Sequence, residues 1–251
     1  MYGWRARIGL IIPSSASTIE PEFYKMVPEG VSVHTSRILL TEMTPENILG
    51  MSKHATRAAK ELKTAGADIL IFGCTAGTFL KGLQYDSKII SNLEKETSIP
   101  TITTSTAALE ALRICQIKNV TVATPYVDKI NATLKTFLEE SGFRVIKIQG
   151  LGLGERKKVF PLSELEISNI GIQEPYLSYK LVRRIFTNDA DGFFISCTNL
   201  RTVEIIKMLE DDLGRPVISS NQASLAIALK RLGIKSEVKG FGTLFERCFS
   251  M

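Results

Sequence analysis

Two segments of this chain, residues 67–75 (ADILIFGCT) and residues 190–198 (ADGFFISCT), share one pattern. Each begins with Ala-Asp, continues with an apolar run and a small residue, and ends in Cys-Thr. Their cysteines, Cys74 and Cys197, are separated by about half of the 251 residues. Self-similarity at half the chain length predicts two related domains rather than a solenoid of short repeats. It also predicts a site in which two thiols, one from each half, face each other.

The similarity extends to both sides of the cysteines. Each cysteine is followed by a proline, a β-branched run, a polar pair and an Ala/Leu-rich stretch, at residues 99–109 and 215–225. Each is preceded by an apolar run and a turn, which is Pro-Ser-Ser after residues 8–12 and Thr-Pro-Tyr after residues 120–123. The duplication therefore covers most of the chain.

Short β-branched runs alternate with amphipathic stretches. We expect strands at residues 8–12, 31–40, 69–72, 101–104, 120–123, 145–148, 193–195 and 217–219. We expect helices at residues 46–65, 128–141, 174–187, 202–212 and 223–232. This alternation, with near-continuous apolar strands, is typical of an α/β protein whose parallel sheets are covered on both faces. Ligands bind such sheets beyond the carboxyl ends of the strands, where both Cys-Thr pairs fall.

The composition, with 44% apolar and 23% charged residues, is that of a soluble globular protein. No apolar run approaches the ~20 residues of a membrane helix. The run at residues 8–12 is shorter than the roughly 7–15 residues of a signal-peptide core, so we expect a cytoplasmic protein. The net charge of +5 is modest and the basic clusters lack aromatic neighbours, so we expect neither nucleic acid nor a membrane as a partner.

The four cysteines form no C-x-x-C pair, so we expect no metal site. Cys115 and Cys248 are assigned to apolar packing. Cys74 and Cys197 each end a predicted strand before a predicted helix start. The free N–H groups and the dipole of a helix start stabilise a thiolate, which favours a reactive role for both.

Hydroxyl groups gather at the predicted strand ends, where turns can present backbone N–H groups to an anion. They belong to Ser14, Ser15, Thr75, Thr78 and Thr198. Each hydroxyl could instead cap a helix. Tyr126, the counterpart of the Ser14 turn, is expected either in the core or pointing into the same cleft. His34 and His54 are the only histidines and lie near no G-x-S-x-G, which excludes a serine hydrolase triad.

Several of these segments resemble the aspartate/glutamate racemase superfamily and, within it, most closely the maleate isomerase and arylmalonate decarboxylase family. They are the segments at residues 73–75, 124–126 and 196–198, together with 13–15, 20–23 and 219–222. The resemblance implies two flavodoxin-like (Rossmann-like) domains related by pseudo-twofold symmetry, with the active site in the cleft between them. It also implies no metal and no organic cofactor. We expect residues 1–105 plus 221–251 to form the domain that carries Cys74, and residues 106–220 the domain that carries Cys197.

The resemblance also implies the site residues. Cys74 and Cys197 would be catalytic, and substrate would be bound by Ser14, Ser15, Thr75, Ala76, Thr78, Tyr126, Asn169 and Thr198. Maleate isomerases usually carry an Asn after Pro-Ser-Ser, where it holds a substrate carboxylate, but this chain has Ala16. A second family Asn matches Asn169. Cysteine at both positions argues against a dedicated arylmalonate decarboxylase, which keeps only the second.

The expected function is that of a cofactor-independent, maleate cis-trans isomerase-like enzyme acting on a small carboxylic acid. The Cys74 thiolate would add to the double bond and Cys197 would protonate the carbanion. Three alternatives stay open: an amino-acid or hydantoin racemase, an arylmalonate decarboxylase-like enzyme, and a non-catalytic protein that binds small acids. The sequence leaves a homo-oligomer open.

Overall fold

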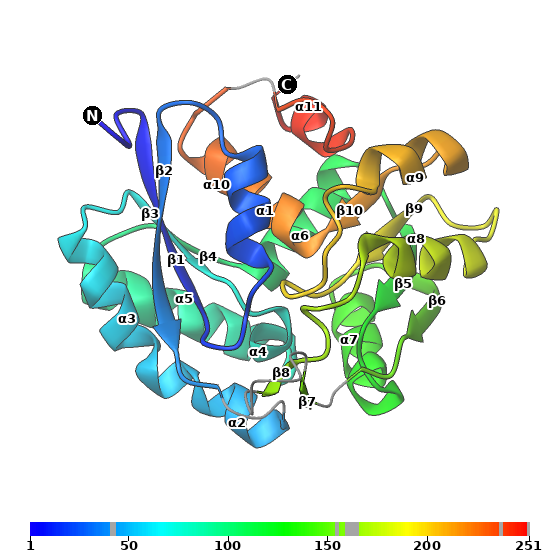
Figure 1. Cartoon of the computed structure of the whole chain (residues 1–251), viewed down its shortest axis with the longest axis horizontal. Coiled ribbons are helices and arrows are strands. Elements are labelled where there is room, and N and C mark those ends of the chain that lie inside the picture. Colours follow the sequence, from blue (N-terminus) through cyan, green and yellow to red (C-terminus); the bar gives the residue numbers. More distant parts are fainter. Residues whose placement is uncertain (41–43, 154–155, 159–165, 236–237, 250–251) are drawn as a thin grey trace.

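Two four-stranded parallel sheets form the frame of the molecule (Figure 1). The computed structural model describes residues 1–40, 44–153, 156–158, 166–235 and 238–249. The first sheet, in the order β2-β1-β3-β4, contains β1 (Ala6–Pro13), β2 (Val31–Ile38), β3 (Ile69–Phe72) and β4 (Thr101–Thr103). The second, in the order β10-β9-β5-β6, contains β5 (Asn119–Thr124), β6 (Arg144–Gly150), β9 (Gly192–Ile195) and β10 (Val217–Ser219). Both halves therefore place their strands in the same order, which confirms the two-domain α/β fold.

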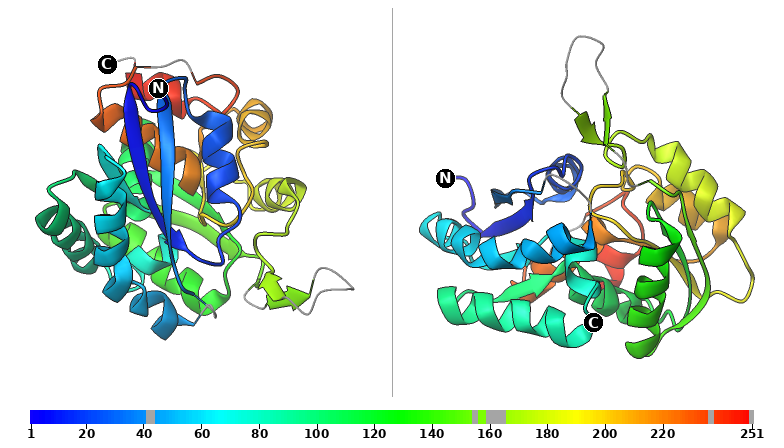
Figure 2. Two further views of the ribbon diagram at one scale, coloured as in Figure 1. Left: turned by 60° about the vertical axis from the view of Figure 1, so that its left-hand side comes forward. Right: turned by 90° about the horizontal axis from the view of Figure 1, so that it is seen from below.

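Helices flank both sheets. The first half contains α1 (Ile19–Met26), α2 (Pro45–Gly50), α3 (Ser52–Thr64), α4 (Thr75–Phe79), α5 (Leu83–Thr97) and α6 (Thr104–Ile114). The second half contains α7 (Asp128–Glu140), α8 (Pro175–Arg184), α9 (Ile206–Leu213), α10 (Ser220–Arg231) and α11 (Leu244–Phe249). An antiparallel ribbon of β7 (Arg156–Lys158) and β8 (Glu166–Ser168) lies at the edge of the body (Figure 2). Within the described ranges, no helix has the length and apolar character needed to cross a membrane.

Two of the expected helices differ from the observed ones. The helix expected over residues 46–65 is divided at Met51 into α2 and α3. The helix expected over residues 202–212 begins only at Ile206. As a result, the segment after Cys197 is a series of turns, whereas the segment after Cys74 enters α4 at once.

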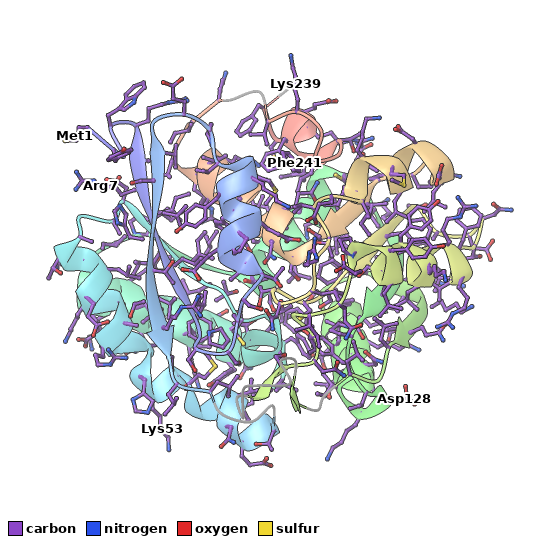
Figure 3. All side chains as sticks on the ribbon, viewed as in Figure 1. Met1, Arg7, Lys53, Asp128, Lys239 and Phe241 are labelled. Carbon is purple, nitrogen blue, oxygen red and sulfur yellow. The ribbon has the colours of Figure 1, made fainter. Side chains whose placement is uncertain are left out.

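The aspartate of each repeat has a structural role. The Asp68 carboxylate accepts the Arg7 N–H at 2.7 Å, at the start of β1. Arg7 is labelled in Figure 3. Asp191 accepts the N–H groups of Lys118 and Asn119 at 3.0 and 2.7 Å, at the start of β5. A backbone N–H without an acceptor at the start of a central strand would lower the free energy of unfolding. The repeated Ala-Asp therefore satisfies the first N–H groups of a central strand in each half.

The two halves interlock through α6 and α10, which pack against each other between the sheets (Figure 1). Residues 220–229 of α10 are all buried. This helix follows β10 in sequence, yet it also contacts α1, β3 and β4 of the first half. In the other direction, α6 follows β4 and contacts β10 and α11. The interface between the halves is therefore part of the core.

Candidate active site

A small cavity lies beyond the carboxyl ends of β1, β3, β5 and β9. Its volume is about 30 Å³, which is room for one or two water molecules. Its lining consists of Pro13, Ser15, Ala16, Cys74, Thr75, Ala76, Tyr126, Ser168, Ile170, Cys197, Thr198 and Asn199. Among these lining residues there is no charged side chain and no histidine. An anion in this cavity would depend on thiols, hydroxyls, an amide and backbone N–H groups.

Cys74 lies two residues beyond β3, at the N-cap of α4, and its side chain is buried. Burial raises the pKa of the Cys74 thiol to about 12, although a hydrogen bond from the Gly77 N–H acts in the opposite direction. A Cβ atom at Gly77 would lie 3.1 Å from the Cys74 sulfur, so glycine leaves room for this approach. The helix start therefore stabilises the Cys74 thiolate as expected, but desolvation outweighs this effect.

Cys197 follows β9 and is also buried. Its sulfur accepts the Asn199 N–H at 3.3 Å, and its own N–H donates to Ser220 Oγ at 3.1 Å. Burial raises the pKa of Cys197 to about 11, while the hydrogen bonds from Asn199 and Tyr126 lower it. Both sulfurs are therefore thiols at neutral pH in the resting site. The hydrogen-bond donors around each sulfur would stabilise a thiolate if one formed.

The Tyr126 hydroxyl interacts electrostatically with both thiols. Burial raises its pKa well above the usual value of 10, and charge on either Cys197 or Cys74 raises it further. The turn between β5 and α7 fixes its position, because its N–H donates to Thr124 Oγ1 at 3.0 Å and its carbonyl accepts from Asn131 Nδ2 at 3.3 Å. Tyr126 is thus a protonated hydroxyl held in place next to both sulfurs.

The threonines of the two Cys-Thr pairs bind across the interface between the halves. Thr75 Oγ1 donates to Ser220 Oγ at 3.2 Å, the same hydroxyl that accepts the N–H of Cys197. Thr198 Oγ1 donates to the Gly73 carbonyl at 3.3 Å. These contacts hold the two cysteine segments against each other.

Three residues that the sequence predicted as substrate-binding are not among the cavity-lining residues. Ser14 Oγ accepts the Leu40 N–H at 3.0 Å. Thr78 Oγ1 donates to the Thr75 carbonyl at 2.9 Å. Asn169 Oδ1 accepts from Gln173 Nε2 at 2.9 Å. Each of these side chains therefore bonds to another group of the protein. The remaining predicted residues, which are Ser15, Thr75, Ala76, Tyr126, Thr198 and both cysteines, line the cavity.

The sequence did not single out Pro13, Ser168, Ile170 or Asn199 as site residues. Ser168 and Ile170 belong to β8 and the turn after it, a segment with no counterpart in the first half. Asn199 follows the second Cys-Thr pair, where the first repeat has Ala76. The donor to the Cys197 sulfur is the Asn199 backbone N–H, which does not depend on residue type, so the sequence contains no signal for it.

Known proteins are similar to this chain over nearly its whole length. The sequence model of a family described as arylmalonate decarboxylase matches residues 8–245. A maleate isomerase from Geobacillus stearothermophilus is 26% identical over 252 residues, covering 95% of this chain and 96% of that protein. An arylmalonate decarboxylase from Bordetella bronchiseptica is 28% identical over 247 residues, covering 95% of this chain and 96% of that protein.

A solved structure shows the same fold. It is a Nocardia farcinica maleate cis-trans isomerase with a cysteine-to-serine substitution and a covalently bound succinylcysteine intermediate. It matches with a TM-score of 0.86 at 20% identity, covering 96% of this chain and 98% of that one. Because the family model extends from β1 to α11, the chain belongs to the arylmalonate decarboxylase family, whose members named above also include a maleate isomerase.

Proposed function

We propose that this chain is a cofactor-independent isomerase that uses Cys74 and Cys197 on a small carboxylic acid, as a maleate cis-trans isomerase does. The observation that carries the proposal is the pair of buried thiols, one from each half, in the lining of one small cavity. The maleate isomerases among its relatives support the same reaction. A protein that only binds an acid would not need a second thiol.

The reaction would begin when the Cys74 thiol loses its proton to solvent water. The thiolate forms a bond between sulfur and one alkene carbon of maleate, and the π electrons move to the other carbon. The Cys197 thiol donates its proton to that carbanion, which leaves a succinyl group on Cys74 and a thiolate on Cys197. Rotation about the new single bond follows. Cys197 then removes the proton, the carbon–sulfur bond breaks, and fumarate and the Cys74 thiolate are released.

The carbanion is stabilised by the adjacent carboxylate, on which charge accumulates. Fixed donors aimed at such a developing charge contribute about 2.7–4 kcal/mol each in comparable oxyanion sites. We assign this role to the Tyr126 hydroxyl and to N–H groups at the strand ends. Ser15, Thr75, Ala76 and Thr198 would contact the substrate. Ser14, Thr78 and Asn169 would support the wall behind them.

A decarboxylase is the second candidate. Pro13, Ala16 and Ile170 make part of the cavity wall apolar, which suits an acid with an apolar group. The relative from Bordetella bronchiseptica is named for that reaction. In this case Cys197 alone would protonate the carbanion left by the loss of CO₂, and Cys74 would be dispensable.

Proton NMR in D₂O with separate maleate, arylmalonate, aspartate, glutamate and hydantoin substrates distinguishes the candidates. The proposal expects conversion of maleate to fumarate. Loss of CO₂ from an arylmalonate alone would make the chain a decarboxylase, and deuterium exchange at an amino-acid or hydantoin α-carbon alone would make it a racemase. The cytoplasmic location and the oligomeric state stay predictions from the sequence.

A further inference from the structure

Glu22 is a buried carboxyl of the first half that accepts two backbone N–H groups of the second half, those of Thr202 and Val203. On α1, its Oε1 accepts the N–H groups of Thr202 and Val203 at 2.5 and 3.1 Å. Its Oε2 accepts Asn221 Nδ2 at 2.6 Å. None of these donors is a cation. A carboxylate taken out of water without a cation needs such donors, so this contact between the halves is a specific one.

Two partners of Glu22, Thr202 and Val203, belong to the segment that follows Cys197. The third partner, Asn221, lies at the start of α10. Asn221 Nδ2 also donates to the Thr198 carbonyl at 3.0 Å, next to the catalytic sulfur. The start of α1 binds the same segment a second time, because Thr18 Oγ1 donates to the Asn199 carbonyl at 3.0 Å. The turns after Cys197 are thus attached to the first half from both ends.

The orientation of the Asn221 amide fits an ionised Glu22, whose only other side-chain hydrogen-bond neighbour among the described residues, Thr202 Oγ1, is 3.5 Å from each carboxylate oxygen. Its NH₂ group donates to both Glu22 and Thr198, whereas its Oδ1 is buried with no partner among the described residues. A buried acceptor without a partner costs about 1–3 kcal/mol. A protonated Glu22 would instead need an acceptor for its O–H. Turning the amide would supply Oδ1, but the Thr198 carbonyl would then lose its donor.

We propose that the ionised Glu22 carboxylate is a positioning residue for Cys197. It orients the Asn221 amide, and through it the Thr198 carbonyl, so that the Cys197 thiol faces the substrate. Uptake of a proton by Glu22 turns the amide and loosens the segment. This role rests on the proposed two-thiol reaction.

The surroundings of Glu22 place this change near neutral pH. Burial raises the pKa of Glu22 to about 7, hydrogen bonds from Thr202, Asn221 and Val203 lower it, and the Glu204 charge raises it. Other charged groups nearby have partners of their own. Glu204, on the segment after Cys197, binds Arg201 at 3.2 Å and Lys25 of α1 at 2.7 Å. Glu20 of α1 binds Arg37. Lys230 and Arg231 of α10 bind Glu110.

The kinetic test compares Glu22→Gln with wild type from pH 6 to pH 9. Below about pH 7, the wild-type slope of log kcat/KM against pH should rise from one to about 1.5, because ionisation of Glu22 adds a roughly tenfold gain to the ionisation of Cys74. Glu22→Gln imitates the protonated acid, so its slope should stay near one and its kcat at pH 8 should fall about tenfold, with KM within about twofold. The control Glu204→Gln removes the same charge nearby and should still show the wild-type change of slope. Glu22→Asp keeps a carboxylate, so it should also show the change of slope, with part of the wild-type kcat.

A second measurement does not need turnover. With ¹⁵N-asparagine labelling, the side-chain amide signals of Asn221, identified by their loss in Asn221→Ala, should shift between pH 6 and pH 8. In Glu22→Gln they should not shift. A folded Glu22→Gln that keeps the wild-type slope, or Asn221 signals that do not move in the wild type, would overturn the proposal. If no maleate is converted but the signals titrate, the proposed reaction fails while the coupling between Glu22 and Asn221 stands.

Discussion

At the scale of single residues, the site combines two thiols that are harder to ionise than ordinary cysteines. Desolvation raises the pKa of both, to about 12 at Cys74 and about 11 at Cys197. An exposed thiolate would be open to oxidation and alkylation, whereas a buried thiol ionises only rarely. The reaction therefore depends on donors such as the Gly77 and Asn199 N–H groups.

This burial predicts the pH dependence of the reaction. Because the reactive form of Cys74 is the thiolate and its pKa lies near 12, the ionised fraction rises about tenfold per pH unit at lower pH. We expect kcat/KM for maleate to rise with a slope near one between pH 7 and pH 9. A plateau beginning at pH 7 would mean that the nucleophile is already ionised there.

Ala16 predicts a change in substrate preference. It is buried and lines the cavity, and its carbonyl accepts from Arg37 at 2.8 Å. An Asn at this position would add a donor for a substrate carboxylate, worth about 1.5–3 kcal/mol. Ala16→Asn should therefore raise kcat/KM for maleate about ten- to hundredfold and lower it for acids with a bulky apolar group. Unchanged or reduced maleate turnover would exclude a carboxylate from this side of the cavity.

At the scale of secondary-structure elements, a hydroxyl side chain caps the matching helix, α6 or α10, in each half. Thr103 caps α6 by accepting the Thr106 N–H at 3.0 Å, and Ser219 caps α10 by accepting the Gln222 N–H at 3.3 Å. Because α6 and α10 each contact the sheet of the other half, we propose domains at residues 1–105 plus 221–251 and at residues 106–220.

The caps predict a matched loss of stability. Thr103→Ala and Ser219→Ala each remove a side-chain acceptor at a helix start, which costs about 1 kcal/mol. We expect each variant to lower the free energy of unfolding by about this amount in urea titrations. Thr136→Ala, on the exposed face of α7, is the control and should change stability by less than about 0.5 kcal/mol. Equal changes in the free energy of unfolding for all three variants would show that the caps make no specific contribution to stability.

Many of the strands and helices could be predicted from the sequence, because the same residue types recur at matching points of the two halves. The Ala-Asp start, the Cys-Thr end and the β-branched runs indicate the strands and the place of both thiols. Ser168 and Ile170 could not be found, since their segment lies outside the repeat. The balance between desolvation and the helix start at Cys74 also could not be predicted, because it depends on how deeply the packing of both halves buries the sulfur.

At the scale of the whole molecule, the interface between the halves places a buried carboxyl, Glu22, beside the site at a cost in stability. Folding raises the pKa of Glu22 from 4.5 to about 7, so the neutral acid stabilises the folded state below pH 4.5. That contribution is lost as the pH rises to about 7. The ionised form needed for positioning is therefore the less stable one, a familiar conflict between stability and function.

This linkage predicts how stability changes with pH. Glu22→Gln lacks the ionisation, so the free energy of unfolding of the wild type, relative to this variant, should fall by about 3 kcal/mol between pH 4.5 and pH 8. Urea unfolding of both proteins across this range measures the difference. If the free energies of unfolding of wild type and Glu22→Gln change in parallel with pH, Glu22 has the same pKa in the folded and unfolded states.

The central claim is that each thiol has its own role in one site, and single alanine variants test it most directly. Maleate turnover should fall below detection in Cys74→Ala and about 10²–10⁴-fold in Cys197→Ala, which loses the general acid. Cys248→Ala, a buried cysteine outside the cavity lining, should keep wild-type kcat. Circular dichroism should show all three variants folded. Near-wild-type turnover in a folded Cys74→Ala or Cys197→Ala would contradict the two-thiol account.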